Sequence, residues 1–442
     1  MKRLFNPCFV LLYLLVITGC RQKKEVKPLP PDAEILHQNQ DLLTQVIIYD
    51  VFTPPVASRI YVYTSLASYE AIRFSKQGAP SIAEKLKGFE KIAMPQPEKG
   101  KTYNYTLAAS KAFFTVVRNV KVFSVDSLKS YEESLFDSFK ASMDDSVYQR
   151  SVALGDTIGK AILVRAKADG YLKSRGKPKF LGSNDPGKWR PTPPDYMDGI
   201  EWCWNTMSPF VLDSAAQFTP PRPPLFSKDT NSVFFKQVKE VYAISKNLTE
   251  EQKLIARYWD DNPFVMEHSG HLMFANKKIT PGGHWMGIAA IAAKETKADA
   301  VKTAQAYSLT AIALFDAFIA CWDEKYRSNY IRPVTVIDES IEQTWTSFLQ
   351  TPPFPEYTSG HSTITRSAAM VLTNLYGDHF AFQDTSDLRY IGLQRHFDSF
   401  VQAADEASIS RVYGGIHYRN SVDQGANTGR KVGELIVEKV LK

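Results

Sequence analysis

The sequence predicts an all-α protein, a multi-helix bundle interrupted by one long ordered loop. Apolar residues recur three and four positions apart over most of the chain, and no run of alternating residues with hairpin turns occurs. The exception is the stretch 177–224, which contains ten of the 25 prolines together with Trp189, Trp202 and Trp204. Proline stops helices and sheets, and the tryptophans favour an ordered loop on the surface or over a cleft.

The helices are expected in two regions, residues 36–229, which include the loop, and residues 230–442. In the first region the helical spacing covers 56–74, 103–120 and 124–173. In the second region helices resume at 231 and continue through 245–260, 283–293, 298–322, 361–376, 386–407 and 424–440. Breaks are expected at the prolines of 332–333 and 351–355.

Composition places the chain among globular proteins and excludes two classes. Its 442 residues are 44% hydrophobic and 23% charged, and 53 basic against 47 acidic residues give a net charge of +6. No long basic block occurs, so the chain is not a dedicated nucleic-acid binder. Four cysteines, two of them in the first twenty residues, exclude a disulfide scaffold, although a bond between Cys203 and Cys321 stays open.

The first residues have the pattern of an export signal. A basic start and an apolar stretch over 9–17 predict a signal peptide at 1–19 that is too short to span a membrane. The ending Ile-Thr-Gly-Cys resembles a bacterial lipobox, which implies lipidation of Cys20 and a polar tether over 20–35. The expected product is an exported lipoprotein of the cell envelope, anchored by lipid only. An unlipidated signal and a plain anchor helix are the alternatives.

The first cluster of candidate functional groups is the pair Lys325 and Arg332. Seven residues correspond to about 700° of helical rotation, so on one helix the two side chains share a face. Both cations can then point into one pocket. A solvated basic face at the end of a helix is the alternative.

The second cluster is Ser359, Gly360 and His361, between a proline-rich loop and an apolar helix. A glycine at a helix N-terminus allows close backbone approach, and the free N–H groups of that terminus favour an anion. A simple capping serine is the alternative.

The third cluster contains Arg411 and His417, separated by a tight turn at Gly414 and Gly415. Arg411 offers a bidentate fork for two oxygens, and the imidazole of His417 can bond to a central atom. A surface arginine and a partly buried histidine are the alternative.

In this order the three clusters resemble the signature of the type 2 phosphatidic acid phosphatase and vanadium haloperoxidase superfamily. The resemblance covers roughly residues 230–442 and extends to the flanking stretches 259–263, 280–285 and 354–357. Those stretches are similar to the long, secreted, haloperoxidase-type branch. The resemblance therefore makes 230–442 the catalytic helical core.

The resemblance also implies a role for each candidate residue. The implied oxyanion cage consists of Lys325, Arg332, Ser359, the backbone N–H of Gly360, and Arg411. His361 becomes the acid/base at the pocket mouth, and His417 becomes the residue that bonds to vanadium or attacks phosphorus. One cage serves both chemistries because trigonal-bipyramidal vanadate has the shape and charge of a phosphoryl-transfer transition state.

The sequence departs from the family pattern at two positions. Thr358 stands where the family usually has proline, and a threonine can still cap the helix. Ser421 stands where the family has an aspartate that orients the last histidine, and the nearest acid is Asp423. We expect this missing carboxylate to weaken His417 as a phosphorus nucleophile and to leave it adequate as a vanadium ligand.

The leading hypothesis is a vanadate-dependent haloperoxidase that oxidises halide with hydrogen peroxide. His361 takes a proton from peroxide, and Lys325 polarises the bound peroxide for attack by halide. One alternative is an acid-type phosphomonoesterase without cofactor, with His417 as nucleophile and His361 as general acid. A second is a surface lipoprotein that uses the same body as a binding module.

The upstream histidines offer a different metal site. Glu267, His268 and His271 have a spacing that holds a metal on a helix, with His284 or Asp261 as a further ligand. The alternative for His284 is that it helps to start a helix or lines the mouth of the active site.

Overall fold

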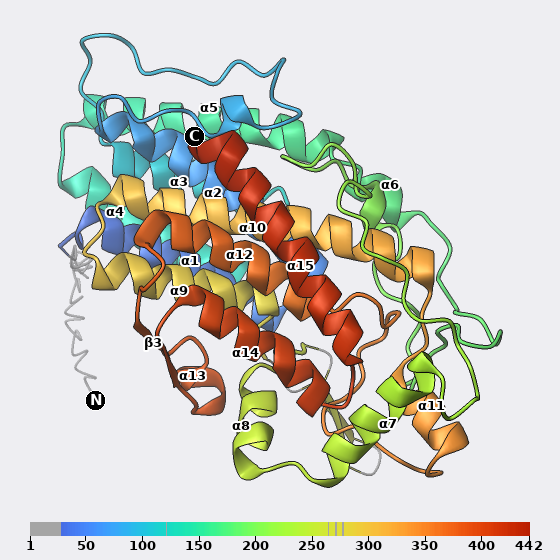
Figure 1. Cartoon of the computed structure of the whole chain (residues 1–442). Coiled ribbons are helices and arrows are strands. Elements are labelled where there is room, and N and C mark those ends of the chain that lie inside the picture. Colours follow the sequence, from blue (N-terminus) through green and yellow to red (C-terminus); the bar gives the residue numbers. More distant parts are fainter. Residues whose placement is uncertain (1–27, 121, 264, 270–271, 276–277) are drawn as a thin grey trace, which may run out of the picture.

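The computed structural model describes residues 28–120, 122–263, 265–269, 272–275 and 278–442, and it confirms the all-α prediction (Figure 1). The N-terminal helices are α1 Asp32–Tyr49, α2 Pro54–Ile72, α3 Tyr105–Val117, α4 Val125–Ala141, α5 Asp145–Ala168 and α6 Tyr171–Arg175. The later helices are α7 Val233–Lys246, α8 Glu250–Tyr258, α9 Pro281–Glu295, α10 Ala300–Ser328, α11 Pro333–Ser340, α12 Gly360–Tyr376, α13 Leu388–Ile391, α14 Phe400–Tyr413 and α15 Arg419–Ile436.

Four short strands form two antiparallel hairpins in this helical frame. β1 Met266–Ser269 pairs with β2 Leu272–Ala275, and β3 Phe382–Asp384 pairs with β4 Arg395–Phe397. The second hairpin is packed through its aromatic ends, since Phe382 lies opposite Phe397 and their rings are 5.7 Å apart.

The helix α10 is the centre of the molecule, with α2 on one side and α12 and α15 on the other (Figure 1). Its most apolar 18-residue window has a mean hydropathy of 1.4, so the helix is long and apolar enough to cross a membrane. However, 94% of that window is buried inside the protein. It is therefore the core helix. Ser308 donates a hydrogen bond to the carbonyl of Ser65 in α2 (2.9 Å). One hydrophobic core thus includes residues from both 36–229 and 230–442.

The predicted loop over 177–224 is ordered and packs against α10. Trp189 and Trp204 are fully buried. Asp316, at 0% exposure in α10, accepts backbone hydrogen bonds from Phe210 (2.8 Å), Val211 (2.7 Å) and Leu212 (3.0 Å). A buried carboxylate with three N–H donors ties the end of the loop to the core helix.

Three sequence predictions about the elements are corrected by the structure. The tether does not extend to residue 35, because α1 begins at Asp32 directly after Pro31. The stretch 124–173 is three helices, with a break at 142–144 before α5. The helix expected over 386–407 is divided into α13, β4 and α14, since Gly392 adopts φ 72° and ends α13.

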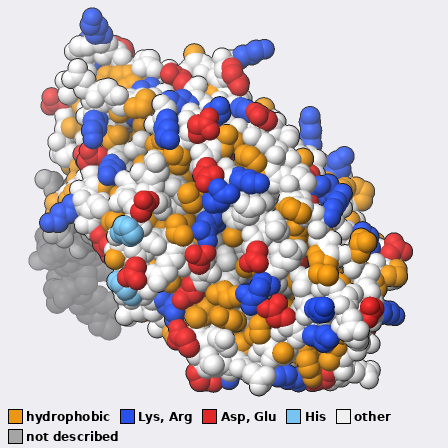
Figure 2. Space-filling view, in the orientation of Figure 1, with side chains coloured by type: hydrophobic (Ala, Val, Ile, Leu, Met, Phe, Trp, Pro, Cys, Tyr) orange, Lys and Arg blue, Asp and Glu red, His pale blue; other side chains and the backbone are white. Residues whose placement is uncertain are grey.

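On the face shown in Figure 2, basic and acidic side chains are interspersed over the surface. No broad area of one sign lies on this face of the described chain. A patch of that kind is what the phosphate backbone of a nucleic acid needs.

Candidate active site

Lys325 and Arg332 belong to two helices rather than to one face of the same helix. α10 ends before Asn329, which adopts a left-handed conformation (φ 48°), and Arg332 is the N-cap residue of α11. The prediction of a shared helix face is therefore wrong, because this turn and Pro333 separate the residues. Both side chains still reach the same segment, residues 354–358, by hydrogen bonds to its carbonyl groups.

Lys325 is a fully buried ammonium group held by backbone carbonyls. Its Nζ donates to the carbonyl oxygens of Pro355 (3.0 Å), Glu356 (3.1 Å) and Thr358 (2.6 Å). Burial lowers the pKa of Lys325 to about 7, and the nearby Arg332 acts in the same direction. An oxyanion that exchanges with one of these carbonyls would stabilise the charged form.

Arg332 and Arg411 each keep a buried nitrogen that has no hydrogen-bond partner among the described residues. Arg332 donates from Nε to the carbonyl of Phe354 (2.9 Å) and from Nη1 to that of Ile416 (2.8 Å), which leaves Nη2 free. Arg411 donates from Nη1 to the carbonyl of Trp259, and its Nε is free. Unpaired buried guanidinium nitrogens are costly unless an anion accepts from them.

The helix α12 begins at the predicted Ser-Gly-His cluster. Ser359 is the N-cap, and its Oγ accepts from the backbone N–H (3.3 Å) and the hydroxyl (2.9 Å) of Ser362. Thr358 is therefore not the cap. A Cβ placed on Gly360 would lie 3.6 Å from the Trp322 ring, an ordinary contact, so the glycine leaves space on the pocket side.

His417 is buried between a carboxylate and a guanidinium group. Its Nδ1 lies 2.8 Å from Oε1 of Glu356, and its Nε2 lies 3.2 Å from Nη1 of Arg332. Burial, together with Arg332 and Lys325, holds the pKa of His417 well below its usual value. The imidazole is neutral, and Nδ1–H donates to Glu356, which leaves the lone pair on Nε2.

Glu356 is the functional residue that sequence reasoning missed. The prediction that His417 lacks a carboxylate is wrong, because Glu356 supplies one from the segment before α12. Ser421 is a weaker partner, with Oγ 3.4 Å from Nδ1, and Asp423 is exposed. Burial raises the pKa of Glu356 to about 7, against the opposing effect of Arg332. The sequence feature that could have identified Glu356 is its position as the one acidic residue between Pro355 and the Ser-Gly-His cluster.

His361 lies at the mouth of the cavity that these residues enclose. The cavity has a volume of about 40 Å³, and its lining includes Gly360, His361, Arg411 and His417. The side chain of His361 is 17% exposed. Its Nε2 has no hydrogen-bond partner among the described residues and is 3.8 Å from Oδ2 of Asp261. Burial and then Arg411 hold the pKa of His361 well below its usual value, so it is a proton acceptor.

The remaining wall of this cavity has an apolar and a polar part. The apolar part consists of Phe318, Trp322, Phe354, Ile416 and four prolines, and the polar part consists of Asp260, Asp261 and Asn262. The apolar part reduces contact with water and strengthens the charge interactions inside the pocket.

The comparisons with known proteins agree with this geometry. The chain is similar to the crystal structure of the first bacterial vanadium-dependent iodoperoxidase, with 45% sequence identity and a TM-score of 0.87. The match covers 93% of this chain and 98% of that chain. The chain belongs to the vanadium-dependent haloperoxidase family.

Two further likenesses concern the fold. A bacterial vanadium-dependent chloroperoxidase in its holo form is 20% identical with a TM-score of 0.69, covering 89% of this chain and 93% of that one. Its apo form is 19% identical with a TM-score of 0.68, covering 88% and 94%. The model of the VCPO second helical-bundle domain matches residues 305–442. No curated protein matches the sequence.

The residues present in this haloperoxidase fit a vanadate group. Within the described part of the chain, Nη2 of Arg332 and Nε of Arg411 are buried donors without partners, and the N-terminus of α12 adds backbone N–H groups. Nε2 of His417 offers a lone pair on the same cavity. Cationic donors for oxygens and one neutral imidazole for the central atom form the donor set that a tetrahedral oxyanion of vanadium needs.

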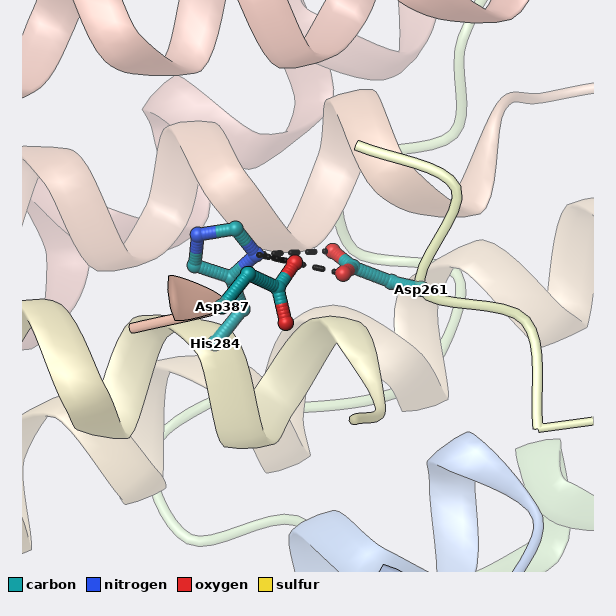
Figure 3. A group of neighbouring side chains, drawn as sticks. All are labelled: Asp261, His284 and Asp387. Atoms are coloured by element: carbon teal, nitrogen blue, oxygen red, sulfur yellow. Dashed lines mark hydrogen bonds and ion pairs between the residues drawn. The ribbon is translucent and has the colours of Figure 1, made fainter. Parts of the chain in front are cut away.

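The metal site considered for the upstream histidines of this haloperoxidase does not form as expected. The backbone around His268 is a strand, so the spacing with His271 does not make a helix face, and His271 lies outside the described residues. His284 and Asp261 do meet, but they bond to each other, with Nδ1 of His284 3.1 Å from Oδ1 (Figure 3).

The two body cysteines of this haloperoxidase are not bonded. Cys203 and Cys321 are both buried free thiols. Sγ of Cys321 instead lies 3.6 Å from the carbonyl of Thr358, which also accepts from Lys325. The bond left open by the sequence is therefore absent.

Proposed function

We propose that this haloperoxidase binds vanadate in the cavity between α10, α12 and α14, and that iodide is its best halide substrate. One observation carries the binding site: Nε2 of the neutral His417 shares a cavity with Arg411 and lies 3.2 Å from Nη1 of Arg332, and each arginine keeps a buried nitrogen with no partner among the described residues. The other cage groups are Lys325, the hydroxyl of Ser359 and the backbone N–H of Gly360.

The protein's own residues divide the work between charge balance and proton transfer. Lys325, Arg332 and Arg411 would balance the negative charge of the oxyanion, and His417 would hold it through Nε2. Vanadate, when bound, supplies a Lewis-acid centre that activates hydrogen peroxide towards halide. His361 would accept and return the peroxide proton at Nε2, which has no hydrogen-bond partner among the residues that the structure describes.

The assignment of iodide rests on the relative at 45% identity, which is an iodoperoxidase. The chloroperoxidases, at 20% and 19% identity, support only the fold. We expect kcat/KM to be highest for iodide and lowest for chloride. Equal rates with chloride would contradict this assignment.

A paired assay tests the activity itself. Purified protein is titrated with vanadate and assayed for oxidation of iodide and bromide by hydrogen peroxide. The same preparation, without vanadate, is assayed for hydrolysis of an aryl phosphate. We expect peroxidase activity that saturates near one vanadate per chain. No oxidation of either halide by loaded protein would refute the proposal.

Phosphomonoester hydrolysis is a second candidate activity because of Glu356. The bond from Nδ1 of His417 to this carboxylate, 2.8 Å long, provides the support that a histidine nucleophile needs. In this reaction His361 would have to gain a proton when the phosphate ester binds, and it would then act as the general acid for the leaving oxygen. We expect slow aryl phosphate hydrolysis in the absence of vanadate and competitive inhibition when vanadate is added.

We also propose that the chain is exported and anchored by acyl chains on Cys20. The support is the basic start, the apolar stretch 9–17 and the Ile-Thr-Gly-Cys ending, all of which lie outside the described residues. Expression in a bacterial host with labelled palmitate tests this. Cys20→Ser should lose the label and leave the membrane fraction, and a label retained by Cys20→Ser would contradict lipidation.

A further inference from the structure

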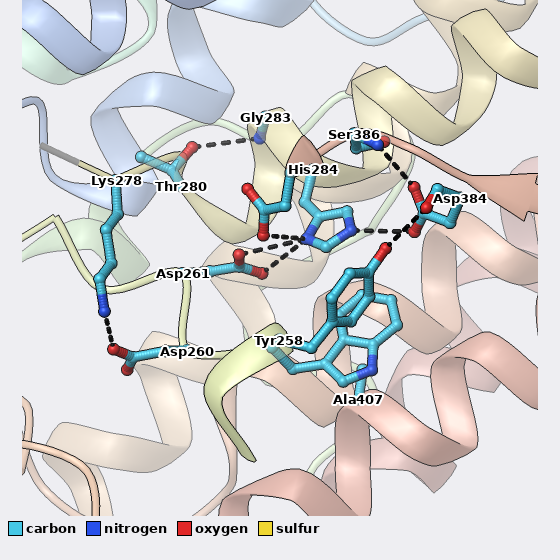
Figure 4. A network of polar contacts seen from close by, with 12 residues as sticks. Tyr258, Asp260, Asp261, Lys278, Thr280, Gly283, His284, Asp384, Ser386 and Ala407 are labelled. Carbon is cyan, nitrogen blue, oxygen red and sulfur yellow. Dashed lines mark hydrogen bonds and ion pairs between the residues drawn. The ribbon is translucent and has the colours of Figure 1, made fainter. Parts of the chain in front are cut away.

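His284 is a fully buried histidine whose two ring nitrogens both meet carboxylates. Nδ1 lies 3.1 Å and 3.2 Å from the two oxygens of Asp261, and Nε2 lies 2.9 Å from Oδ2 of Asp384 (Figure 4). Asp387 approaches Nδ1 as well, at 3.6 Å (Figure 3). A neutral imidazole has one N–H, so only an imidazolium can donate to both sides.

The charges around His284 favour that imidazolium. Burial lowers its pKa, but Asp261, Asp384 and Asp387 outweigh burial and hold the pKa well above the usual value. The same imidazolium keeps the pKa of Asp384 low despite burial. Nδ1 of His284 with Asp261 and Asp387 could instead hold a metal ion, which would need a neutral imidazole that donates only to Asp384.

Aromatic side chains fix the orientation of the imidazolium. The ring of Trp259 is stacked on His284, with centroids 4.5 Å apart and an interplanar angle of 18°. Tyr258 meets the imidazole edge-on at 5.4 Å and donates from its hydroxyl to the carbonyl of Asp384 (3.2 Å). These contacts hold the imidazolium between its carboxylates.

The segment that carries these aromatic residues also contacts the active site. The carbonyls of Trp259 and Asp260 accept from Nη1 of Arg411, and Oδ2 of Asp261 lies 3.8 Å from Nε2 of His361. Residues 258–261 therefore connect the His284 cluster to a cage cation and to the acid/base residue.

The groups that face His361 differ in sign. Asp261, from the segment after α8, favours the protonated form of His361. Arg411 from α14, His284 from α9 and Lys325 from α10 oppose it, as does His417 when it is protonated. Two contacts from the segment after α8 thus favour proton uptake by His361: the approach of Asp261 and the hydrogen bond to the backbone of Trp259.

We propose that His284 is a positioning residue of this haloperoxidase. Asp384 holds His284 in place, and His284 in turn holds Asp261 near His361, which controls proton transfer by His361. The proposal rests on the role of His361 given above. It assigns to His284 and Asp384 an effect on turnover although neither lines the vanadate cavity.

The test compares Asp384→Asn, Asp387→Asn and His284→Gln with the control His396→Gln, since His396 is an exposed histidine outside the cluster. In vanadate-free protein with ¹⁵N-labelled histidine, the ring signals of His361 are assigned and followed with pH. In loaded protein, kcat, the KM for iodide and the vanadate Kd are measured, with the Tm of each variant.

We expect Asp384→Asn to lower the pKa of His361 and to lower kcat about tenfold, as the loss of a supporting residue does. In Asp384→Asn the KM for iodide should stay within about twofold of the wild-type value. The control His396→Gln should match the wild type in every measurement, because substitutions on the distant surface have small effects. Asp384→Asn and Asp387→Asn keep side-chain volume, so they carry the test if His284→Gln does not fold.

Two results would overturn the proposal. One is an unchanged His361 titration and unchanged kcat in Asp384→Asn with only a lower Tm, which would make the cluster a packing feature. The other is one divalent metal ion per chain in the purified protein that is lost in Asp387→Asn. If the wild type oxidises no halide, the proposed function fails, but the histidine signals of vanadate-free protein still test the coupling.

Discussion

His417 and His284 are equally buried histidines of one protein in opposite charge states. His417 touches one carboxylate, Glu356, and is surrounded by the cations Arg332, Lys325 and Arg411, which hold its pKa low. His284 is surrounded by three carboxylates and is held as a cation. Burial alone would neutralise both residues, so the neighbouring charges decide which one becomes a ligand and which a fixed charge.

The difference shows how the two sides of the site are specialised. The cage side carries excess positive charge and one neutral lone pair, which an oxyanion needs. The other side carries three carboxylates around one imidazolium, and one of them, that of Asp261, lies near His361. His361 lies between them, 3.8 Å from Asp261 on the second side.

The largest effect is expected from the residue between the two sides. His361→Ala should reduce peroxidase turnover by roughly 10²–10⁴-fold, because a general acid/base contributes that much, while vanadate binding changes little. Steady-state kinetics and calorimetry on the same sample measure both. A loss of vanadate affinity as large as the loss of rate would make His361 a ligand.

The next largest effect tests the carboxylate on the cage side. Glu356→Gln should weaken vanadate binding by about 10–100-fold, since a partner that orients a metal-bound histidine contributes that range. Asp423→Asn is the matched control, because Asp423 is exposed and outside the cavity lining. Equal losses in both variants would mean that Glu356 does not orient His417.

The affinity for vanadate should also depend on pH through Lys325. In the free protein its pKa is lowered to about 7, and an oxyanion needs the charged form, so binding takes up a proton above pH 7. Affinity then falls by up to about tenfold per pH unit for one linked proton. Calorimetry in two buffers of different ionisation enthalpy measures the uptake. Lys325→Met should bind more weakly and abolish this proton uptake.

The smallest effect concerns stability and the cation on the other side. The pKa of His284 is higher in the folded than in the unfolded protein, so its contribution is fully present below pH 6.5 and is lost as pH rises through the folded value. The free energy of unfolding should fall by about 1 kcal/mol per pH unit in that window. Urea titrations from pH 6 to 9 should give a shallower slope for His284→Gln. An identical slope in the wild type and in His284→Gln would mean that His284 is not charged in the folded protein.

The sequence was sufficient for the groups that act within a few residues of one another. Ser359, Gly360 and His361 begin a helix as predicted, because capping and helix termini are local properties. Glu356 was missed because its partner His417 lies 61 residues away, and the family pattern pointed to position 421 instead. A contact between separate elements leaves no periodic signal in one sequence.

The same limit explains the other errors. The spacing of Lys325 and Arg332 was interpreted as one helix, although Asn329 turns the chain between them. The apolar residues of 386–407 have helical spacing, but Phe382 and Phe397 pair as strands because tertiary packing outweighs propensity. The roles of His284 and Asp384 depend on residues 100 apart and were not accessible from spacing.

The position of α10 has a consequence for how the chain folds. This apolar helix is covered by α2, which is synthesised more than 200 residues earlier, and by α15, which lies near the end of the chain. Contacts of such sequence separation make folding slow, and the uncovered helix is prone to aggregation until synthesis is complete. A fragment of residues 305–442 would lack α2 and the loop that Asp316 holds, so we expect it to need a chaperone or to precipitate.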